Sequence, residues 1–240
     1  MLAERLQILS ERLGEMAELV RSMLYNALAA LETRNIGLAE RIVVDELAVN
    51  RMETANLEEA VHVIALFQPM GKNIRQLVAV ILVNRDLERI ADHAQNIECH
   101  ARFLAGQPPT PAPPELAVME ELARKMLADS LRAYEEQDEE LAKLVIAGDE
   151  ELNELTKKTV RGLLVQMAQA GSRPGAEELM ECYWRLALVA RNLERVGDHA
   201  TNIAESVLFV VESHLHLHHK QEIAKELAAM KRRRSPKKKR

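Results

Sequence analysis

The chain has 240 residues, 48% of them hydrophobic and 29% charged, with nine glycines and only seven aromatic side chains, which indicates a helical globular protein and not a β-rich one. Its two cysteines exclude a disulfide framework, and its longest apolar run, Leu77 to Val83, is too short to cross a bilayer as a helix. Residues 231–240 hold eight Lys or Arg, which leaves residues 1–230 with a net charge of −13 and argues against nucleic-acid binding by this acidic body.

Hydrophobic periodicity predicts six helices, at about residues 2–33, 36–65, 69–104, 114–135, 138–170 and 174–214. The first residues, Met-Leu-Ala-Glu-Arg, mix charged and apolar side chains and lack the apolar stretch of an export signal, so we expect a cytoplasmic protein. Pro69 and Pro174 suit the first turns of the third and sixth helices, where proline's missing amide hydrogen is not needed.

The stretch Gly106-Gln-Pro-Pro-Thr-Pro-Ala-Pro-Pro114 holds five of the eight prolines and separates the first three predicted helices from the last three. A segment of this composition is stiff and extended. We therefore predict an all-α fold of two tandem three-helix bundles, residues 1–106 and 114–215, joined by a linker at 107–113. Residues 216–240 contain histidines and a basic run, and we expect a disordered tail that either improves solubility or contacts anionic lipid or an acidic partner.

One line of thirteen residues occurs twice in the chain. Arg85-Asp-Leu-Glu-Arg-Ile-Ala-Asp-His-Ala-Gln-Asn-Ile97 returns 106 residues later as Arg191-Asn-Leu-Glu-Arg-Val-Gly-Asp-His-Ala-Thr-Asn-Ile203, with nine identical positions. This repeat indicates that the chain was built from two copies of one unit, so any chemistry that the line carries is expected to exist twice.

The repeated line has an apolar and an acidic face when it is drawn as a helix. Five apolar residues share one side and are predicted to pack in the core: Val83, Leu87, Ile90, Ala94 and Ile97. Two polar ladders lie away from that side: Glu88, Asp92 and Asn96 in the first unit, and Glu194, Asp198 and Asn202 in the second. Like charges four residues apart destabilise a helix by a few tenths of a kcal/mol, and a bound cation would relieve this repulsion.

The helix before each ladder carries the same spacing, in the pairs Glu46 with Asn50 and Asp149 with Asn153. Two ladders on adjacent helices would converge into an oxygen-rich patch. Oxygen ligands suit Mg²⁺, Mn²⁺, Ca²⁺ and iron, and no thiolate cage for structural zinc is present. The alternative is a solvated helix face with ordinary surface ion pairs, but the doubled pattern favours a metal site.

His93 and His199 follow the aspartates but do not fit a ferritin-type di-iron site. Such sites use Glu-x-x-His, whereas Glu88 lies five residues before His93. We expect both histidines to cap a helix, face solvent or contact a neighbouring helix. Cys99 lies beside the first ladder and is a weak ligand candidate. A further cluster, His214, His216, His218 and His219, forms either a polar end of the last predicted helix or an adventitious metal site.

The two acidic lines resemble the paired Glu/Asp-x-x-x-Asp motifs of the PhoU family of bacterial phosphate-signalling regulators. Gln68-Pro-Met-Gly-Lys-Asn-Ile-Arg75 is similar to the family's Gln-Pro-x-x-x-Asp-Leu-Arg motif, and the resemblance covers about residues 2–212. Asn73 stands where the family usually has Asp. The first line also continues with Glu98-Cys99 where the second continues with Ala204-Glu205, so a weaker first metal site is expected.

The resemblance implies a cytoplasmic adaptor and not an enzyme. PhoU-like proteins act between the ATPase subunit of a phosphate ABC transporter and a phosphate-sensing histidine kinase, and they restrain the phosphate-starvation response. The resemblance also implies a homodimer that reaches the membrane through its partners and carries iron, zinc or other cations in surface clusters. The first-choice metal ligands are then Glu88, Asp92, Glu194 and Asp198; the second-choice ligands are Glu46, Asn50, Asp149, Asn153, Asn96 and Asn202.

Three alternatives remain open. A carboxylate-metal enzyme would also need a base or nucleophile in a pocket, and no Ser/His/Asp or Cys/His arrangement is visible in the sequence. A purely structural helical dimer would explain the apolar stripes but not the repeated acids. A PhoU-like accessory protein of a secondary phosphate transporter would use the same fold, and its gene would neighbour a single symporter gene instead of an ABC transporter operon.

Overall fold

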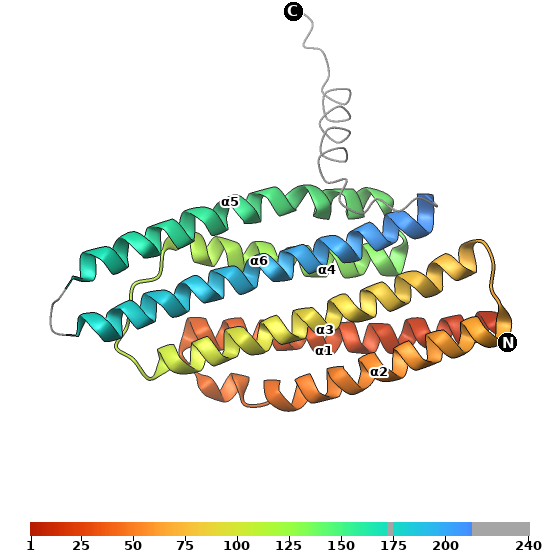
Figure 1. The fold of residues 1–240 in the computed structure, drawn as a ribbon, viewed down its shortest axis with the longest axis horizontal. Helices are drawn as coiled ribbons and strands as arrows, with labels where there is room; N and C mark the ends of the chain where they lie inside the picture. The colour runs from red at the N-terminus through yellow and green to blue at the C-terminus, as the bar shows by residue number, and fades with distance from the viewer. Residues whose placement is uncertain (172–174, 213–240) are drawn as a thin grey trace, which may run out of the picture.

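The computed structural model describes residues 1–171 and 175–212, and this part of the chain contains helices and no strand (Figure 1). The elements are α1 (Leu2–Thr33), the 3₁₀ helix η1 (Ile36–Ala39), α2 (Ile42–Phe67), α3 (Lys72–Ala105), α4 (Pro114–Glu136), α5 (Glu139–Ala170) and α6 (Ala176–Glu212). The predicted all-α fold of two three-helix sets is confirmed.

Two predicted helix boundaries are wrong. The helix predicted for residues 36–65 is interrupted, because the Asn35 side chain accepts a hydrogen bond from Gly37 N (3.1 Å) and starts η1, so that α2 begins only at Ile42. Pro69 does not lie in the first turn of a helix: α3 begins at Lys72, after Gly71 has turned the chain with a φ of 59°. Pro174 lies outside the described residues.

Four helices lie side by side in the order α2, α3, α6, α5, and α1 and α4 pack behind α3 and α6 (Figure 1). The two halves meet mainly where α3 packs against α6, and these two helices run in opposite directions. The five residues predicted for the apolar side of the repeated line are all buried. Buried residues of both halves form one continuous core, so the halves share packing although each is one copy of the unit. Independent folding of each half stays a prediction.

The two halves repeat even a small polar contact inside the core. Asn56 Nδ2 of α2 lies 4.0 Å from Met16 Sδ of α1, and Thr159 Oγ1 of α5 lies 3.4 Å from Met119 Sδ of α4. Both pairs occupy corresponding positions, 103 residues apart. Helices α2 and α5 are therefore equivalent elements, aligned residue by residue at this offset.

The first half adds a buried amide pair that the second half lacks. Asn56 Nδ2 donates to Asn84 Oδ1 (3.0 Å), and Asn84 Nδ2 donates to the carbonyl oxygen of Glu53 (2.9 Å). The position that corresponds to Asn84 in the second half is Ala190. Buried amides are tolerated when their hydrogen bonds are satisfied, and these bonds join α3 to α2 at one defined register.

An arginine attaches the start of the linker to the first half. Arg34 ends α1 in the left-handed conformation, with a φ of 57°. Its Nη2 donates to the carbonyl oxygens of Leu104 (2.6 Å) and Ala105 (3.1 Å) and to that of Gln107. These bonds satisfy carbonyl groups that the end of α3 leaves without a helical partner.

A pair of carboxyl groups lies where α1 approaches α4. Glu120 of α4 is buried, and its pKa is raised to about 8 by burial and by the hydrogen bond and charge of Glu32 on α1. Arg124 of α4 opposes this shift, and its Nη2 lies 2.9 Å from Glu32 Oε1. The corresponding position in the first half is the buried Ala17. The second half thus contributes a protonatable group to the contact between the halves.

Candidate functional site

Both acidic ladders lie on the side of α3 and α6 that points away from the core, as the helical wheel predicts. The exposed fractions of the side chains match between the halves: 16% for Glu88 and 33% for Asp92, against 17% for Glu194 and 30% for Asp198. The glutamate of each ladder is therefore the deeper ligand candidate, and the aspartate one turn later is the more accessible one.

Arginines of the same helices pair with all four carboxylates. Arg89 Nε lies 3.4 Å from Glu88 Oε2, and Arg89 Nη1 lies 3.3 Å from Asp92 Oδ2. In the second half Arg191 Nη1 lies 3.3 Å from Glu194 Oε2, and Arg195 Nη1 lies 3.1 Å from Asp198 Oδ2. About half of each arginine side chain is exposed, so such pairs contribute under about 1 kcal/mol each and a bound cation could replace them.

The first patch is built from α2 and α3. Glu46 Oε1 accepts a hydrogen bond from Asn50 Nδ2 (2.6 Å), as their spacing suggests. The pKa of Glu88 is raised by burial first and then by the charge of Asp92, and Glu53 and Glu46 of α2 add to the shift while Arg89 opposes it. Three neighbouring carboxylates therefore act on Glu88 here. Glu53 was missed by sequence reasoning, although it follows Glu46 by two helical turns and so shares its face.

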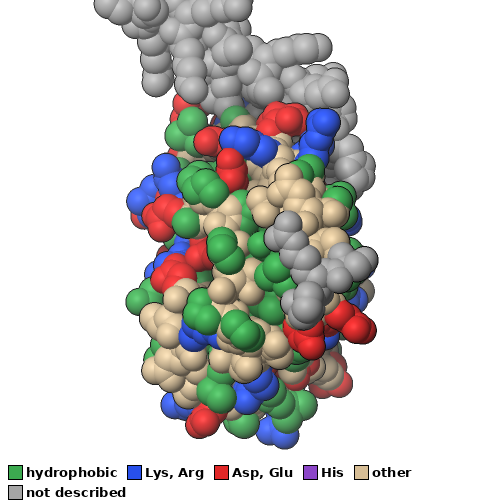
Figure 2. Space-filling view, turned by 90° about the vertical axis from the view of Figure 1, so that its left-hand side faces the viewer, with side chains coloured by type: hydrophobic (Ala, Val, Ile, Leu, Met, Phe, Trp, Pro, Cys, Tyr) green, Lys and Arg blue, Asp and Glu red, His purple; other side chains and the backbone are tan. Residues whose placement is uncertain are grey.

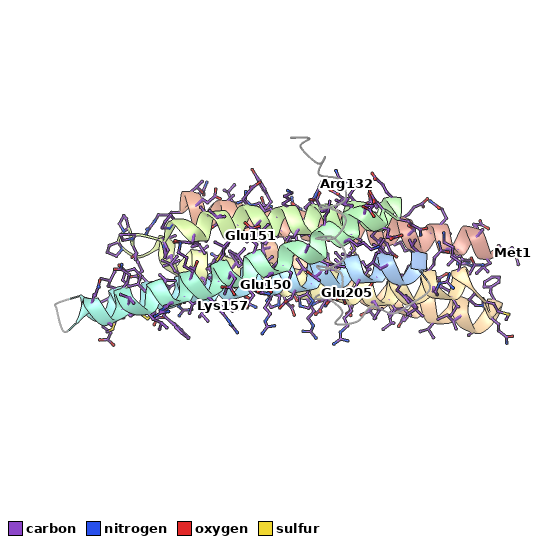
Figure 3. All side chains as sticks on the ribbon, turned by 90° about the horizontal axis from the view of Figure 1, so that it is seen from above. Met1, Arg132, Glu150, Glu151, Lys157 and Glu205 are labelled. Atoms are coloured by element: carbon purple, nitrogen blue, oxygen red, sulfur yellow. The ribbon has the colours of Figure 1, made fainter. Side chains whose placement is uncertain are left out.

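The second patch, on α5 and α6, has a different composition. Asp149 is buried; its Oδ2 accepts from Asn153 Nδ2 (3.0 Å), and its Oδ1 lies 3.4 Å from Thr201 Oγ1 of α6. Thr201 was also missed, because only the packing of α5 on α6 brings it to Asp149. Lys157 lies along α5 (Figure 3), and the charge of Glu194 contributes to its raised pKa after the larger effect of Glu154. The positively charged side chain of Lys157 therefore lies near the second patch.

The two asparagines at the ends of the ladders are exposed, and one of them points elsewhere. Asn202 Nδ2 donates to Asp86 Oδ1 of α3 (3.0 Å), so its amide is directed at the contact between the halves. Within residues 1–171 and 175–212, no group of three or more His, Cys, Asp or Glu side chains has the geometry of a metal site. The donor chemistry still suits a hard cation. Glu194 Oε2 is buried and has the ion pair with Arg191 but no hydrogen bond, and burial together with neighbouring carboxylates raises the pKa of Glu88, so a bound cation would stabilise the charged form of Glu88.

The histidines of the repeated line contact the neighbouring helix, one of the three roles expected for them. The rings of His93 and His199 stack across α3 and α6 with centroids 5.6 Å apart. His93 Nδ1 donates to Asn192 Oδ1 (3.0 Å) and His199 Nδ1 to Asp86 Oδ1 (2.8 Å), so equivalent residues exchange partners about an approximate two-fold axis. Burial lowers the pKa of His93. These histidines join the two halves and are not among the candidate metal ligands.

The remaining candidates contribute little to either patch. Cys99 as a whole residue is exposed, but its thiol is partly shielded from solvent. This shielding and then the charge of Glu98 raise the pKa of the thiol, which disfavours the thiolate form that binds metals. The cluster from His214 to His219 lies outside the described residues. At the linker end of the molecule, apolar, basic and acidic side chains are intermixed, without a large area of one kind (Figure 2). No helix in the described ranges is both long and apolar enough to cross a membrane.

Comparison with known proteins agrees with this fold and its repeat. The family profile described as "PhoU domain" matches residues 13–99 and again residues 116–207, one match in each half. The phosphate-specific transport system accessory protein PhoU homolog of Xylella fastidiosa (strain Temecula1) is 33% identical over 196 residues, which cover 82% of this chain and 79% of that protein. The homolog of the same name from Zymomonas mobilis is 34% identical and covers 81% and 80% of the two chains. The crystal structure of PhoU from Pseudomonas aeruginosa superposes with a TM-score of 0.84 at 28% identity, and the match covers 89% of this chain and all of that one. With two family matches that span most of its length, this chain belongs to the PhoU family.

Proposed function

We propose that this protein is an accessory protein of phosphate transport that acts by binding partners and metal cations and not by catalysis. The observation that carries the proposal is the repeated ladder, because both copies present the same two carboxylates at nearly the same depth on a PhoU fold. Relatives at 33–34% identity are named as accessory proteins of the phosphate-specific transport system.

The finer assignment concerns the partners. The protein binds the ATPase subunit of a phosphate ABC transporter and a phosphate-sensing histidine kinase, works in the cytoplasm as a homodimer, and restrains the phosphate-starvation response when phosphate is plentiful. Support comes from family membership and from elongated helical faces that offer docking area without a catalytic constellation among the described residues. The acidic body also disfavours direct binding to DNA.

Metal cations would be held at the two patches. In the first patch Glu88 and Asp92 are the primary ligands, and Glu46, Glu53, Asn50 and Asn96 are secondary candidates. In the second patch Glu194 and Asp198 are the primary ligands, and Asp149 and Asn153 are secondary candidates, whereas the Asn202 amide is directed at Asp86. Iron, zinc or another divalent cation would neutralise the carboxylates and fix α2 against α3 and α5 against α6. The carboxylate density of the first patch and Lys157 near the second favour tighter binding at the first, opposite to the order expected from the motif departures.

Metal content of purified variants tests these ligands. Glu88→Ala/Asp92→Ala should lose the first metal complement and Glu194→Ala/Asp198→Ala the second. The pair Glu11→Ala/Glu15→Ala on α1 is the control, because these exposed acids have the same spacing but face no second ladder. The assignment fails if both ladder variants keep the metal content of the control.

A deletion strain tests the regulatory role. Grown in ample phosphate, it should express phosphate-starvation genes, and pull-down from membranes with the purified protein should recover the ABC transporter ATPase or the kinase. Normal repression in a strain that has no second PhoU-like protein would count against the role. Recovery of a phosphate symporter instead would support the accessory protein of a secondary transporter, which the fold accommodates equally.

A further inference from the structure

Helix α2 carries an apolar stripe on its outer face. Val43, Leu47, Leu57 and Val61, which we call the α2 stripe, are each between 41% and 55% exposed. With Asn50 and Thr54 between them, these four residues follow one another at steps of four or three residues, so all of them lie on one side of the helix. An apolar row on a helix at the edge of the molecule is typical of a surface that another helix or segment covers (Figure 1).

The second half shows that the fold does not need this stripe. Helix α5 has Ile146, Glu150, Val160 and Leu164 at the corresponding positions. Ile146 is buried, Glu150 is charged and Val160 is half-buried, so only Leu164 is an exposed apolar residue. The same unit therefore folds without an exposed apolar row at these positions, and the α2 stripe calls for a separate explanation.

Charge narrows down what could cover the stripe. Helix α2 carries five carboxylates, Asp45, Glu46, Glu53, Glu58 and Glu59, against the single base Arg51. Two copies of this acidic face would repel each other, so a second α2 is a poor occupant. A segment with apolar residues at helical spacing and an excess of basic side chains would match both features of the face.

This chain contains such a segment directly after α6. Residues 220–240 hold ten Lys or Arg and two Glu, and Ile223, Leu227 and Met230 follow one another at steps of four and three. The last turn of α6 lies against the first turn of α3, because Arg75 Nε donates to the carbonyl oxygen of Val210 (3.4 Å). Helix α2 ends at Phe67, only eight residues before Arg75, so the described part of α6 ends near the end of α2.

The distance can be bridged within one molecule. Residues 213–219 span up to about 23 Å when extended, at ~3.3 Å per residue. Passing from α6 over α3 to α2 takes two interhelical steps of about 8–10 Å each. An occupant from the same molecule is therefore within reach of the stripe.

We propose that residues 220–240 bind the α2 stripe of the same molecule, with Ile223, Leu227 and Met230 against the apolar side chains and the basic residues beside the α2 carboxylates. This contact is separate from the transport role proposed above. It covers the outer face of the first half only.

Zero-length carbodiimide cross-linking of the full-length protein at low salt tests the contact, because it joins lysines to carboxylates only where they touch. Lys225 and Lys231 should link to Glu58, which adjoins Leu57 of the α2 stripe and is not among the candidate metal ligands. In a mixture of ¹⁴N- and ¹⁵N-labelled protein these links should stay within one isotope. Links between isotopes would overturn the intramolecular contact, and so would links spread evenly over the carboxylates of α2 and α5.

A matched pair of substitutions separates docking on the stripe from general charge attraction. Val61→Gln in α2 removes an apolar side chain without adding a carboxylate, and it should lower the yield of these cross-links at least fivefold. Leu164→Gln, at the corresponding and equally exposed position of α5, should leave the yield unchanged. Circular dichroism checks that both variants fold, and equal yields in the two variants would overturn the proposal.

Discussion

The two halves keep the same acidic line but surround it with different helices. On α3 and α6 the ladder carboxylates lie at matching depths, whereas α2 offers further acids and an apolar outer face where α5 offers Lys157 and a buried Asp149. The line is thus the common element and the flanking helices are where the copies have diverged. The two patches should therefore differ in affinity and in partners while they share one ligand geometry.

The largest expected effect follows from cutting the chain between the halves. Residues 1–106 and 114–230, made separately, should each be helical, because each contains three amphipathic helices. Each should lose at least about 3–5 kcal/mol of unfolding free energy relative to the intact protein, because α3 and α6 then expose apolar side chains that now bury one another. Circular dichroism and urea titration measure both quantities. If neither half is helical, the core is a single unit and the domain boundary fails.

A pH-dependent difference is expected from the carboxyl pair between α1 and α4. Glu120 has a pKa of about 8 in the folded protein, raised from the ordinary value near 4.5. Folding therefore favours the protonated carboxyl group. The contribution of Glu120 to the free energy of unfolding is largest below pH 4.5 and decreases as the pH rises to about 8. Glu120→Gln should remove this slope. The variant should match the wild type near pH 4 and be more stable by about 2–4 kcal/mol near pH 8. Urea titrations at the two pH values decide, with the exposed Glu121→Gln as control; an equal slope in all three proteins would refute the assignment.

The two repeated lines differ at one small residue, which is Ala91 in the first half and Gly197 in the second. An added Cβ at Gly197 would lie 2.3 Å from Leu152 Cδ2, whereas the first line has Ala91 at this position. Gly197→Ala should cost about 1–3 kcal/mol through overpacking, and Ala91→Gly about 1 kcal/mol through helix propensity. Gly162→Ala, where nothing lies within 4 Å of the new atom, should be neutral or stabilising in the same urea assay. A stabilised Gly197→Ala variant would show that Leu152 moves freely.

The smallest effect concerns metal affinity. Lys157→Thr gives the second patch the residue that the first has at Thr54, and Thr54→Lys makes the reverse exchange. Removing the Lys157 ammonium group should tighten metal binding at the second patch about two- to fivefold, and adding a lysine at position 54 should weaken metal binding at the first patch by a similar factor. Calorimetric titration in variants that retain one ladder measures each site. Unchanged affinities would mean that Lys157 acts only on Glu154 of α5 and not on the patch, and changes of the opposite sign would refute the prediction.

Periodicity predicted most of the fold, since 3.6-residue spacing determines which side of a helix is buried, and the five core residues and both ladders were placed correctly from it. Contacts between helices were not predictable in this way. Glu53 acts on Glu88 only because α2 packs beside α3, and Asp86 reaches His199 only because α3 and α6 pair in opposite directions. The helix start expected at Pro69 failed because a glycine two residues later turns the chain.

The buried amide pair of Asn56 and Asn84 sets how the first patch lines up. If α2 slid along α3 by one turn, about 5.4 Å, both amides would lose their partners in an apolar surrounding, and each unmet group would cost about 1–3 kcal/mol. The same slide would carry Glu46 and Glu53 one turn away from Glu88. The two asparagines thus fix the register of α2 along α3, and with it the position of Glu46 and Glu53 relative to Glu88. In the second half, where Thr159 and Ala190 stand in their place, α5 and α6 lack this amide pair and are joined instead by the hydrogen bond of Thr201 to the buried Asp149.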